Sequence, residues 1–291
     1  MTDGGDGGHI NPDGSAARDP GVPTAGGLFA PRTHRDRMDA EVDLVDALAG
    51  RGLVAVVGAG GKKTTLWALA ARHDRAVVTA ATRIPMFEER VADLVETTDP
   101  VAAVEAALDR EAAGESPWPL GLVPGRADEV RYEGYGTGTI SALAEAVGDE
   151  LDAILLKADG ARNRLFKAPD EHEPQVPDRA DTVLPIASAK VVGEPLTEAS
   201  VHRPGLVGGI ADLEPGEVIR PVHVARVLAS DRGGLKNVPD GATPIPVVNM
   251  CDDEALAAVG REVAEGVLER AEVPRVVLTR MDRGEVVDVV E

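Results

Sequence analysis

A short run of glycines, lysines and threonines at residues 58–65 (GAGGKKTT) has the residue types of a phosphate-binding loop. Residues without side chains let backbone amides close around an anion, and lysines beside them add positive charge. A threonine hydroxyl is a suitable ligand for hydrated Mg²⁺, and we expect Thr64 to take that role. The residues that we expect to contact a nucleotide here are Gly58, Ala59, Gly60, Gly61, Lys62, Lys63, Thr64 and Thr65.

The flanking residues place this run between a strand and a helix. Residues 53–57 are apolar and largely β-branched, which is typical of a strand buried on both faces. Residues 64–70 have helical character, and the N-terminal amides and dipole of a helix favour an anion. The other interpretation is a glycine-rich turn with two solvated lysines. Because strand, glycines, lysines and helix occur together, the sequence favours nucleotide binding, to ATP or GTP with Mg²⁺.

The run departs from the usual Walker pattern, G-x-x-x-x-G-K-[ST]. If Lys62 is the phosphate lysine, Val56 stands where the first glycine belongs, and Lys63 stands where Ser or Thr belongs. What remains is a shorter G-x-x-G-K at residues 58–62, which resembles the loops of Mur-type ligases. We expect Lys62 to contact the β- and γ-phosphates, with Lys63 as the alternative.

A second candidate site follows the apolar residues 151–158, which predict another buried strand. An apolar strand that ends in an acid is the Walker-B arrangement, in which the carboxylate holds the metal directly or through water. We therefore expect Asp159 to hold Mg²⁺ and position water, and Arg162 to stabilise charge on the transferring phosphoryl group. The alternative is a plain Asp-Gly turn with a surface arginine.

The residues after a third strand, 245–249, suggest how a base is read. Asn249 and Asp252 have the spacing of the N-K-x-D element that binds guanine in GTPases, but Met250 replaces the lysine. The thioether of Met250 is able to cover a ring. The alternative is an Asx turn in which Asp252 caps a helix that begins at residue 253. The two interpretations are compatible.

Further polar residues lie at predicted strand ends and in two proline-containing segments. Thr79 and Thr82 accompany the strand predicted at 76–80, where their hydroxyls suit the γ-phosphate or its metal. Residues 167–177 contain three prolines, which suit a wall or lid over the ligand. His172 and His202 suit metal binding or proton transfer, although isolated loop histidines are more often plain hydrogen-bonding residues.

Strands and helices alternate from residue 38 onward, which predicts a doubly wound, mostly parallel α/β sheet with helices on both faces, like that of P-loop NTPases. Ligands of such sheets bind at the carboxyl ends of the strands. Residues 1–37 are crowded with Gly, Pro, Asp and Arg, so we expect a disordered tail. Besides the elements above, we expect strands at 119–123, 182–187, 275–279 and 285–290, the last two as an edge hairpin, and helices at 39–49, 100–113, 139–147, 221–229 and 253–272.

The composition excludes several classes of protein. The 291 residues include 50 acidic and 30 basic side chains, and the net charge of −20 disfavours binding to nucleic acid. This acidic bias resembles proteins of salt-rich cytoplasm. Cys251 is the only cysteine, so an internal disulfide and a cysteine-based zinc cluster are excluded; we expect it to pack at a strand end rather than react. No apolar run approaches the ~18 residues that span a bilayer, and no signal-type segment begins the chain, so we expect a cytoplasmic protein without a membrane partner.

Several strings together resemble the YqeC family, in the family's order from residue 42 to 279: VGAGGKKTTL, VVTAATRI, LLKADGAR, FKAP, HEPQVP, VHRP and GLKNVP followed by PVVNMCDD. This family comprises accessory proteins of selenium-dependent molybdenum hydroxylases, also named selenium cofactor biosynthesis proteins. The resemblance implies a nucleotide-binding protein whose partner is a molybdenum hydroxylase or another cofactor-maturation protein. Lys157 stands where many relatives carry Glu, and Met250 where Lys is usual. By matching positions, the polar surround of the site is Lys167, His172, Glu173, His202 and Arg203.

Three functions are consistent with these residues. The first is an Mg²⁺-dependent accessory NTPase of molybdenum hydroxylase maturation. The second is an NTP-dependent transferase or ligase that activates a small acid or a selenium species. The third is a non-catalytic module that binds nucleotide as a structural or sensing ligand.

Overall fold

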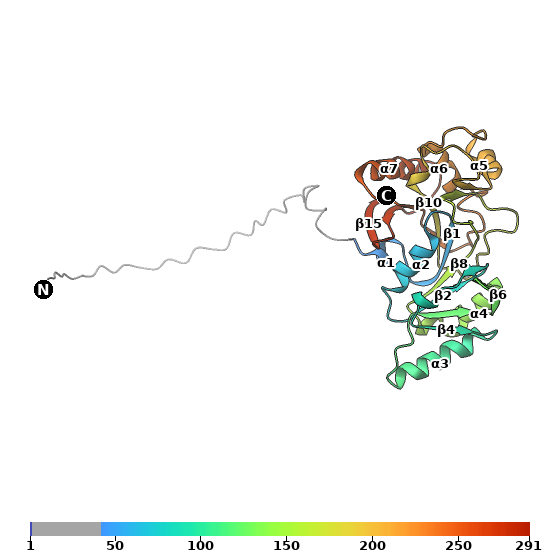
Figure 1. The fold of residues 1–291 in the computed structure, drawn as a ribbon, viewed down its shortest axis with the longest axis vertical. Helices are drawn as coiled ribbons and strands as arrows, with labels where there is room; N and C mark the ends of the chain where they lie inside the picture. Colours follow the sequence, from blue (N-terminus) through green and yellow to red (C-terminus); the bar gives the residue numbers. More distant parts are fainter. Residues whose placement is uncertain (2–41) are drawn as a thin grey trace, which may run out of the picture. The chain divides into compact units, whose positions relative to one another are not determined.

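The structure, a computed structural model, describes Met1 and residues 42–291 (Figure 1). Apart from Met1, the tail predicted at 1–37 lies outside the described residues, as does its boundary with the α/β domain. The described residues from 42 onward belong to one compact unit.

A ten-stranded sheet forms the centre of this unit, and its strands run parallel except for an antiparallel hairpin at one edge. The predicted α/β class with a mostly parallel sheet is therefore confirmed. In spatial order the strands are β15 (Glu285–Val290), β14 (Val276–Arg280), β13 (Val247–Asn249), β10 (Thr182–Ser188), β1 (Gly52–Gly58), β8 (Ala153–Lys157), β2 (Ala76–Ala80), β5 (Leu120–Val123) and β4 (Asp93–Glu96), with the short β12 (Thr243–Pro244) beside β10.

Helices cover both faces of the sheet, as the alternation of β1 shows. Leu53, Ala55 and Val57 pack on the face covered by α3 and α4, whereas Val54 and Val56 pack on the face covered by α1 and α2. In Figure 1, α5, α6 and α7 gather at the hairpin end of the sheet and α3 at the other end. The helices are α1 (Leu44–Ala47), α2 (Lys62–Ala70), α3 (Pro100–Ala112), α4 (Thr137–Val147), α5 (Pro204–Ala211), α6 (Pro221–Leu228) and α7 (Glu254–Leu268).

The strand order brings three carboxyl ends together at the middle of the sheet. Strand β8 lies between β1 and β2, so the chain crosses over β8 when it passes from β1 through α2 to β2. In the register, Lys157 at the end of β8 lies beside Val56 of β1 and Ala80 of β2. The loops that follow these strands therefore meet at one edge of the sheet, where α/β proteins bind ligands.

Several elements were not predicted because they are short or lack apolar alternation. The predicted helix at 39–49 is represented among the described residues by α1 alone, which begins after Asp43, whose carboxylate accepts a hydrogen bond from the Asp46 amide at 3.0 Å. No helix within residues 42–291 combines the length and the apolar character needed to cross a bilayer. Besides β4, β12 and α5, the unpredicted elements are β3 (Ile84–Pro85), β6 (Arg126–Asp128), β7 (Arg131–Tyr132), β9 (Phe166–Lys167) and β11 (Val201–His202), and three 3₁₀ turns at Glu88–Arg90, Gly148–Glu150 and Ala189–Val191.

Candidate functional site

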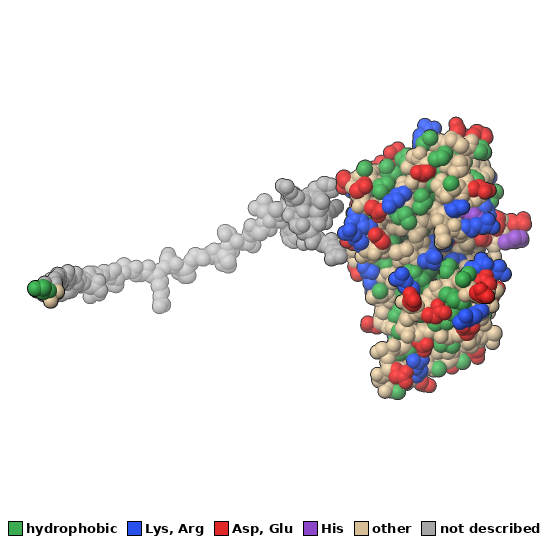
Figure 2. All heavy atoms as spheres, in the orientation of Figure 1, with side chains coloured by type: hydrophobic (Ala, Val, Ile, Leu, Met, Phe, Trp, Pro, Cys, Tyr) green, Lys and Arg blue, Asp and Glu red, His purple; other side chains and the backbone are tan. Residues whose placement is uncertain are grey.

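A cavity of about 690 Å³ opens where the loops after β1, β2 and β8 meet. Seven of its lining residues are basic and one, Glu173, is acidic, although the chain as a whole carries a net charge of −20. Figure 2 shows Lys and Arg side chains in a band across the middle of this face. The basic lining residues are Lys62, Lys63, Arg83, Arg131, Lys157, Arg162 and Arg164.

The loop after β1 has a backbone path that requires glycine. Gly58, Gly60 and Gly61 have φ angles of 88°, 89° and 133°, which residues with side chains rarely adopt. A Cβ atom on Gly61 would clash with the side-chain amide of Asn249, and one on Gly58 would clash with the carbonyl of Ile186. The glycines therefore allow a tight loop that packs directly against β10 and β13.

The loop and the first turn of α2 leave a row of donors for a ligand. The five backbone N–H groups from Gly60 to Thr64 donate to no acceptor within residues 42–291, whereas Ala59 donates to Ile186 and Thr65 to Gly61. The same five residues line the cavity. A helix N-terminus has unsatisfied N–H groups and a positive dipole end, so this edge of the cavity suits an anion.

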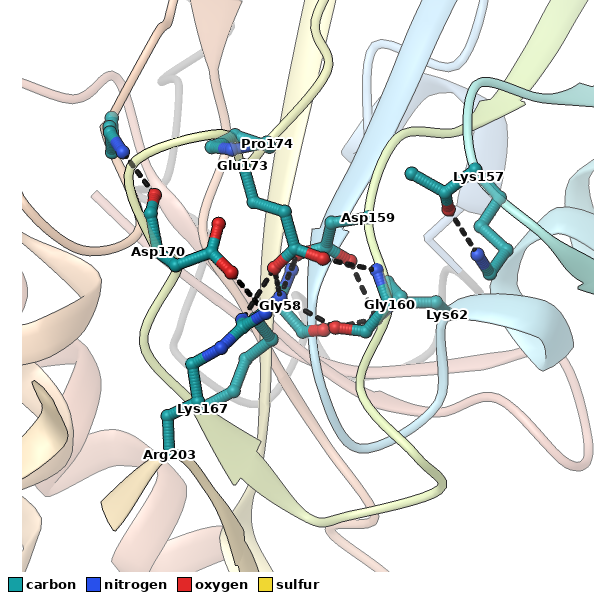
Figure 3. Close-up of polar contacts among 12 residues, drawn as sticks. Gly58, Lys62, Lys157, Asp159, Gly160, Lys167, Asp170, Glu173, Pro174 and Arg203 are labelled. Atoms are coloured by element: carbon teal, nitrogen blue, oxygen red, sulfur yellow. Dashed lines mark hydrogen bonds and ion pairs between the residues drawn. The ribbon is translucent and has the colours of Figure 1, made fainter. Parts of the chain in front are cut away.

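Behind the loop lies a buried ion pair between Lys62 and Asp159 (Figure 3). The Lys62 ammonium lies 2.7 Å from Asp159 Oδ1 and also contacts the Gly58 carbonyl, while Asp159 Oδ2 accepts the Gly58 amide at 2.9 Å. Lys167 approaches the same Oδ2 at 2.9 Å. Oδ1 thus takes part in the ion pair with Lys62, and Oδ2 in the ion pair with Lys167. Asp159 thus joins the loop to the strand next to it.

The ion pairs continue from Asp159 to the surface. Lys167 donates to Glu173 at 2.6 Å and to the Gly160 carbonyl at 2.6 Å. Arg203, just before α5, contacts Glu173 at 2.6 Å and Asp170 at 2.5 Å. This chain of alternating charges, from Lys62 to Asp170, connects the glycine loop with the segment 167–177.

Burial and neighbouring charges shift the pKa values of these groups. Burial acts to raise the pKa of Asp159, but Lys62 and Lys167 outweigh it and hold the pKa below its usual value, so the carboxylate is ionised. Glu173 follows the same pattern, because Lys167 and Arg203 outweigh its burial and lower its pKa. Burial, reinforced by the charge of Lys62, lowers the pKa of Lys157 to about 7.

Lys157 lines the cavity without a carboxylate partner. Its ammonium donates to Thr82 Oγ1 at 2.6 Å and to the Arg83 carbonyl at 2.8 Å, which ties the loop after β2 to β8. Lys62, Arg83 and Arg131 are each paired with a carboxylate. Lys63, Lys157, Arg162 and Arg164, in contrast, form no ion pair within residues 42–291. These four cations are available to an anionic ligand.

The two residues expected to read a base lie outside the cavity lining. The Asn249 amide donates to the Gly60 carbonyl at 2.8 Å, and its oxygen accepts bonds from Thr279 at 3.1 Å and from the Met281 amide at 3.0 Å. Asp252 pairs with Lys190 at 2.5 Å. Asn249 therefore braces the loop from behind, and recognition of guanine by this pair stays a prediction.

The helix after β13 begins one residue later than expected. Asp253, not Asp252, is the N-cap of α7, and its carboxylate accepts the Leu256 amide at 2.8 Å. The prediction that Asp252 caps this helix is wrong because Asp252 turns toward Lys190 instead. Met250, from the same segment, does line the cavity.

The threonines divide into cavity and core residues. Thr64 and Thr82 line the cavity. Thr65 donates back to the Gly61 carbonyl at 3.1 Å, and the buried Thr79 donates to the Leu122 carbonyl at 2.8 Å. The hydroxyls of Thr65 and Thr79 thus satisfy backbone carbonyls in this structure.

Neither predicted histidine lines the cavity. The His172 side chain is 83% exposed and lies beside Glu171. His202 pairs in parallel register with Lys167, and burial together with Arg203 lowers its pKa. Cys251 is buried, and burial raises the pKa of its thiol to about 11, which is unfavourable for a reactive cysteine.

A metal at this site would depend on the ligand for most of its coordination. Within the part of the chain that the structure describes, no three His, Cys, Asp or Glu side chains lie close enough to bind a metal together. Asp159 does not line the cavity, and its Oδ1 lies 2.7 Å from the Lys62 ammonium, whereas Thr64 lines the cavity. The Thr64 hydroxyl suits an Mg²⁺ ion that is held mainly by phosphate oxygens, and Asp159 would act on such an ion through water.

Four polar cavity residues were not singled out from the sequence, nor were the apolar Pro85 and Leu165: the polar ones are Arg83, Arg131, Asn163 and Arg164. Arg83 follows the predicted strand at 76–80, and the rule that ligands bind at strand ends is the signal that points to it. Asn163 and Arg164 belong to the turn that follows Arg162, where Arg162 and Asn163 have φ angles of 48° and 59°. Arg131 lies on a strand of two residues and had no sequence signal.

Comparison with known proteins identifies similar chains. The model of the family described as YqeC protein matches residues 54–205, which include the glycine loop, the Asp159 segment and the ion pairs from Lys167 to Arg203. The uncharacterized protein YqeC of Escherichia coli (strain K12) is 29% identical over 201 residues, which cover 68% of this chain and 75% of that protein.

Proposed function

This chain belongs to the YqeC family, and we propose that it is an Mg²⁺-dependent nucleotide-binding NTPase that assists maturation of a molybdenum hydroxylase. The observation that carries the nucleotide part of this proposal is the cavity, which is lined by seven cations on a strongly acidic chain. Such a local reversal of charge is favourable only when it serves an anion, and polyphosphate is the anion that a glycine loop before a helix suits best.

The loop residues divide the work of holding the phosphates. The free N–H groups of residues 60–64 are donors for the β- and γ-phosphates. Lys63 is half-buried and unpaired among the described residues, so its ammonium is ready for a phosphate oxygen. Lys62 already contacts Asp159 and the Gly58 carbonyl, and it adds positive charge beneath the loop. This is the P-loop-like arrangement that we propose, with strand β8 and its terminal acid next to β1.

Mg²⁺, when bound with the nucleotide, would supply charge neutralisation of the phosphates. Thr64 would contribute its hydroxyl, and Asp159, which does not line the cavity, would act on the metal by way of water. Arg162 lines the cavity near these groups and would stabilise charge on the phosphoryl group. The attacking group in hydrolysis is a water, and Asp159 is the carboxylate that we propose to orient it.

The segment 167–177 is the part that would report the state of the nucleotide. A row of ion pairs runs from Lys62 through Asp159 and Lys167 to Glu173 (Figure 3). These ion pairs connect the segment with the back of the glycine loop. A phosphate that draws Lys62 toward the cavity weakens its pair with Asp159, and the remaining pairs readjust. The proposed role in hydroxylase maturation rests on what the family resemblance implies, namely an accessory protein of selenium-dependent molybdenum hydroxylases. The partner that we propose is therefore a hydroxylase or another maturation protein.

Isothermal titration calorimetry with ATP, GTP and their diphosphates, with Mg²⁺ and at high salt, tests the site. The variant Lys62→Ala/Lys63→Ala is expected to lose at least about tenfold in affinity, because it removes two cations beside the loop. Lys190→Ala removes a cation that is paired with Asp252 outside the cavity, and it serves as the matched control. Undiminished affinity in the double variant would refute the assignment. Tight binding without turnover would instead favour a non-catalytic nucleotide sensor.

A second candidate function is supported by the arginines of the cavity. Arg83, Arg131 and Arg164 lie on segments other than the glycine loop, and their charge exceeds what a nucleotide alone requires. This favours the NTP-dependent transferase or ligase, with a small acid or a selenium species as acceptor. Nucleotide turnover measured with selenide, cysteine or molybdopterin separates the two functions, because only a transferase forms a product that contains the acceptor.

A further inference from the structure

The cavity extends well beyond the glycine loop along the edge of the sheet. Its lining begins with Met250 after β13 and reaches Thr82 and Arg83 after β2, with the loop after β1 between them. Adjacent strands are about 4.8 Å apart, so the ends of β1 and β2, which are separated by β8, lie about 10 Å apart. The same separation holds on the other side between β1 and β13.

The two sides of the loop differ in chemistry. On the β13 side the lining includes Met250, whose sulfur accepts a hydrogen bond from the Ser188 hydroxyl at 3.1 Å, and Leu165, whose carbonyl accepts the Ser188 amide at 3.1 Å. On the β2 side stand Arg83 and Arg131, the latter directly opposite Pro85 in the pairing of β3 with β7. A polarisable thioether suits the face of a nucleoside base, whereas guanidinium groups suit oxyanions.

The number of charges also exceeds what one nucleotide neutralises. Three lining cations, Lys63, Arg162 and Arg164, have no carboxylate partner among the described residues, and neither has Lys157, whose pKa is lowered to about 7. A triphosphate with Mg²⁺ carries about two net negative charges. Arg83 and Arg131 add two more cations whose partners, Glu133 and Asp128, are partly exposed. Exposed ion pairs contribute only ~0–1 kcal/mol, so a ligand oxyanion can replace them at small cost.

From this geometry we infer a second ligand subsite on the β2 side of the cavity, formed by Arg83 and Arg131 with Lys157 beside them. It binds a small acceptor that carries a phosphate or carboxylate group. This inference rests on the proposed function and adds to it the class of the second substrate. The acceptor lies next to the end of the polyphosphate that faces β8, while the base lies toward Met250.

Arginine forks bind both oxygens of a phosphate or carboxylate, and two forks on one wall orient such a group. Lys157 donates to the Arg83 carbonyl at 2.8 Å, which fixes the backbone at Arg83, and Asp128 orients Arg131 at 2.6 Å until a ligand oxyanion replaces this carboxylate. Lys157 therefore links the acceptor wall to β8.

The experiment is a calorimetric titration of phosphoglycerate into protein that is already saturated with a non-hydrolysable ATP analogue and Mg²⁺. The variant is Arg83→Gln/Arg131→Gln. The matched control is Arg126→Gln, because Arg126 lies on the same small sheet, is 57% exposed and is paired with Glu96, but does not line the cavity. Glycerol phosphate and glycerate, titrated in parallel, show whether the phosphate or the carboxylate is bound.

We expect phosphoglycerate to bind the loaded wild type and the control alike, and the double variant to bind it at least about tenfold more weakly. The affinity of the variant for the nucleotide analogue should change less than about threefold. Binding of phosphoglycerate only to nucleotide-free protein, an equal loss of both ligands in the variant, or no binding of any of the three probes would each overturn the inference. Arginine-dependent binding of phosphoglycerate to a protein that binds no nucleotide would refute the proposed nucleotide site and leave a single arginine site.

Discussion

Replacing Asn249 by alanine separates the two roles that this residue can have. In the structure the Asn249 side chain makes three hydrogen bonds, to the Gly60 carbonyl, the Thr279 hydroxyl and the Met281 amide, and it is 2% exposed. If it braces the glycine loop, Asn249→Ala leaves these three groups without a partner. If it reads guanine, the substitution mainly removes a contact with the base.

The expected loss of stability follows from the number of bonds. A buried hydrogen bond contributes about 1 kcal/mol net, so the loss of three predicts a decrease of about 3 kcal/mol in the free energy of unfolding. For a domain of this size the urea m-value is about 3 kcal/mol per molar, which places the shift of the unfolding midpoint near ~1 M. Asp252→Asn removes only a half-exposed ion pair with Lys190, and its shift should be small.

The matched nucleotide measurement decides between the roles. A brace fixes the loop that holds the phosphates, so Asn249→Ala should weaken ATP and GTP by the same factor. Equilibrium urea unfolding gives the stability, and calorimetry with both nucleotides gives the ratio of affinities. Wild-type stability together with a selective loss of GTP would refute the brace and establish base recognition by Asn249.

Three further predictions follow from the same contacts. Gly61→Ala places a side chain at a φ of 133° against Asn249, and we expect it to lower the free energy of unfolding in urea by about 1–3 kcal/mol. The control Gly138→Ala, in the open first turn of α4, should instead stabilise the protein by about 0.5–1 kcal/mol, and equal effects of the two substitutions would contradict this explanation of the loop. Asp159→Asn leaves the buried Lys62 without a carboxylate and Lys167 with Glu173 alone, and it should cost about 3–5 kcal/mol. The control is Asp93→Asn, because the Asp93 side chain is 34% exposed and pairs with Arg110; equal stability of the two variants would show that the buried ion pairs are dispensable. Folding lowers the pKa of Glu173, so its contribution to stability is present above pH 4.5 and is lost as the pH falls through the lower folded pKa. Glu173→Gln should therefore reduce the dependence of the free energy of unfolding on pH in this acidic range. An unchanged dependence would argue against the pairs with Lys167 and Arg203.

The central strands were predictable because each is a compact apolar run followed by a polar residue. The strand predicted at 76–80 coincides with β2, and the strand at 53–57 lies within β1, since burial on both faces requires uninterrupted apolar residues. Edge strand β4 was missed because its apolar run is only two residues long and is flanked by Asp93 and Glu96, as the edge of a sheet permits. A two-residue strand such as β7 has no periodicity that a sequence can reveal.

The site was predictable where one local segment builds it and not where distant segments meet. The strand-to-helix context of residues 58–65 is local, and the structure places most of that segment around the cavity. The ion pair between Lys62 and Asp159 joins residues far apart in the chain, and it depends on β8 pairing beside β1, which no local pattern specifies. For the same reason the sequence suggested a base-binding role for Asn249, because its bond to Gly60 becomes visible only when β13 and the loop are placed together.

The buried charges around Asp159 bear on how ligand binding and stability are coupled. Lys62, Lys157 and Lys167 surround two carboxylates, those of Asp159 and Glu173, so the interior beside the cavity holds more positive than negative charge. The lowering of the Lys157 pKa to about 7 is one expression of this excess. An anion bound in the cavity removes the excess and favours the charged form of Lys157. The folded state with ligand therefore gains more than the contacts of the ligand alone, and binding should stabilise this domain strongly, in proportion to affinity and ligand concentration. A carboxylate introduced at position 157 would balance the interior without ligand and weaken that coupling.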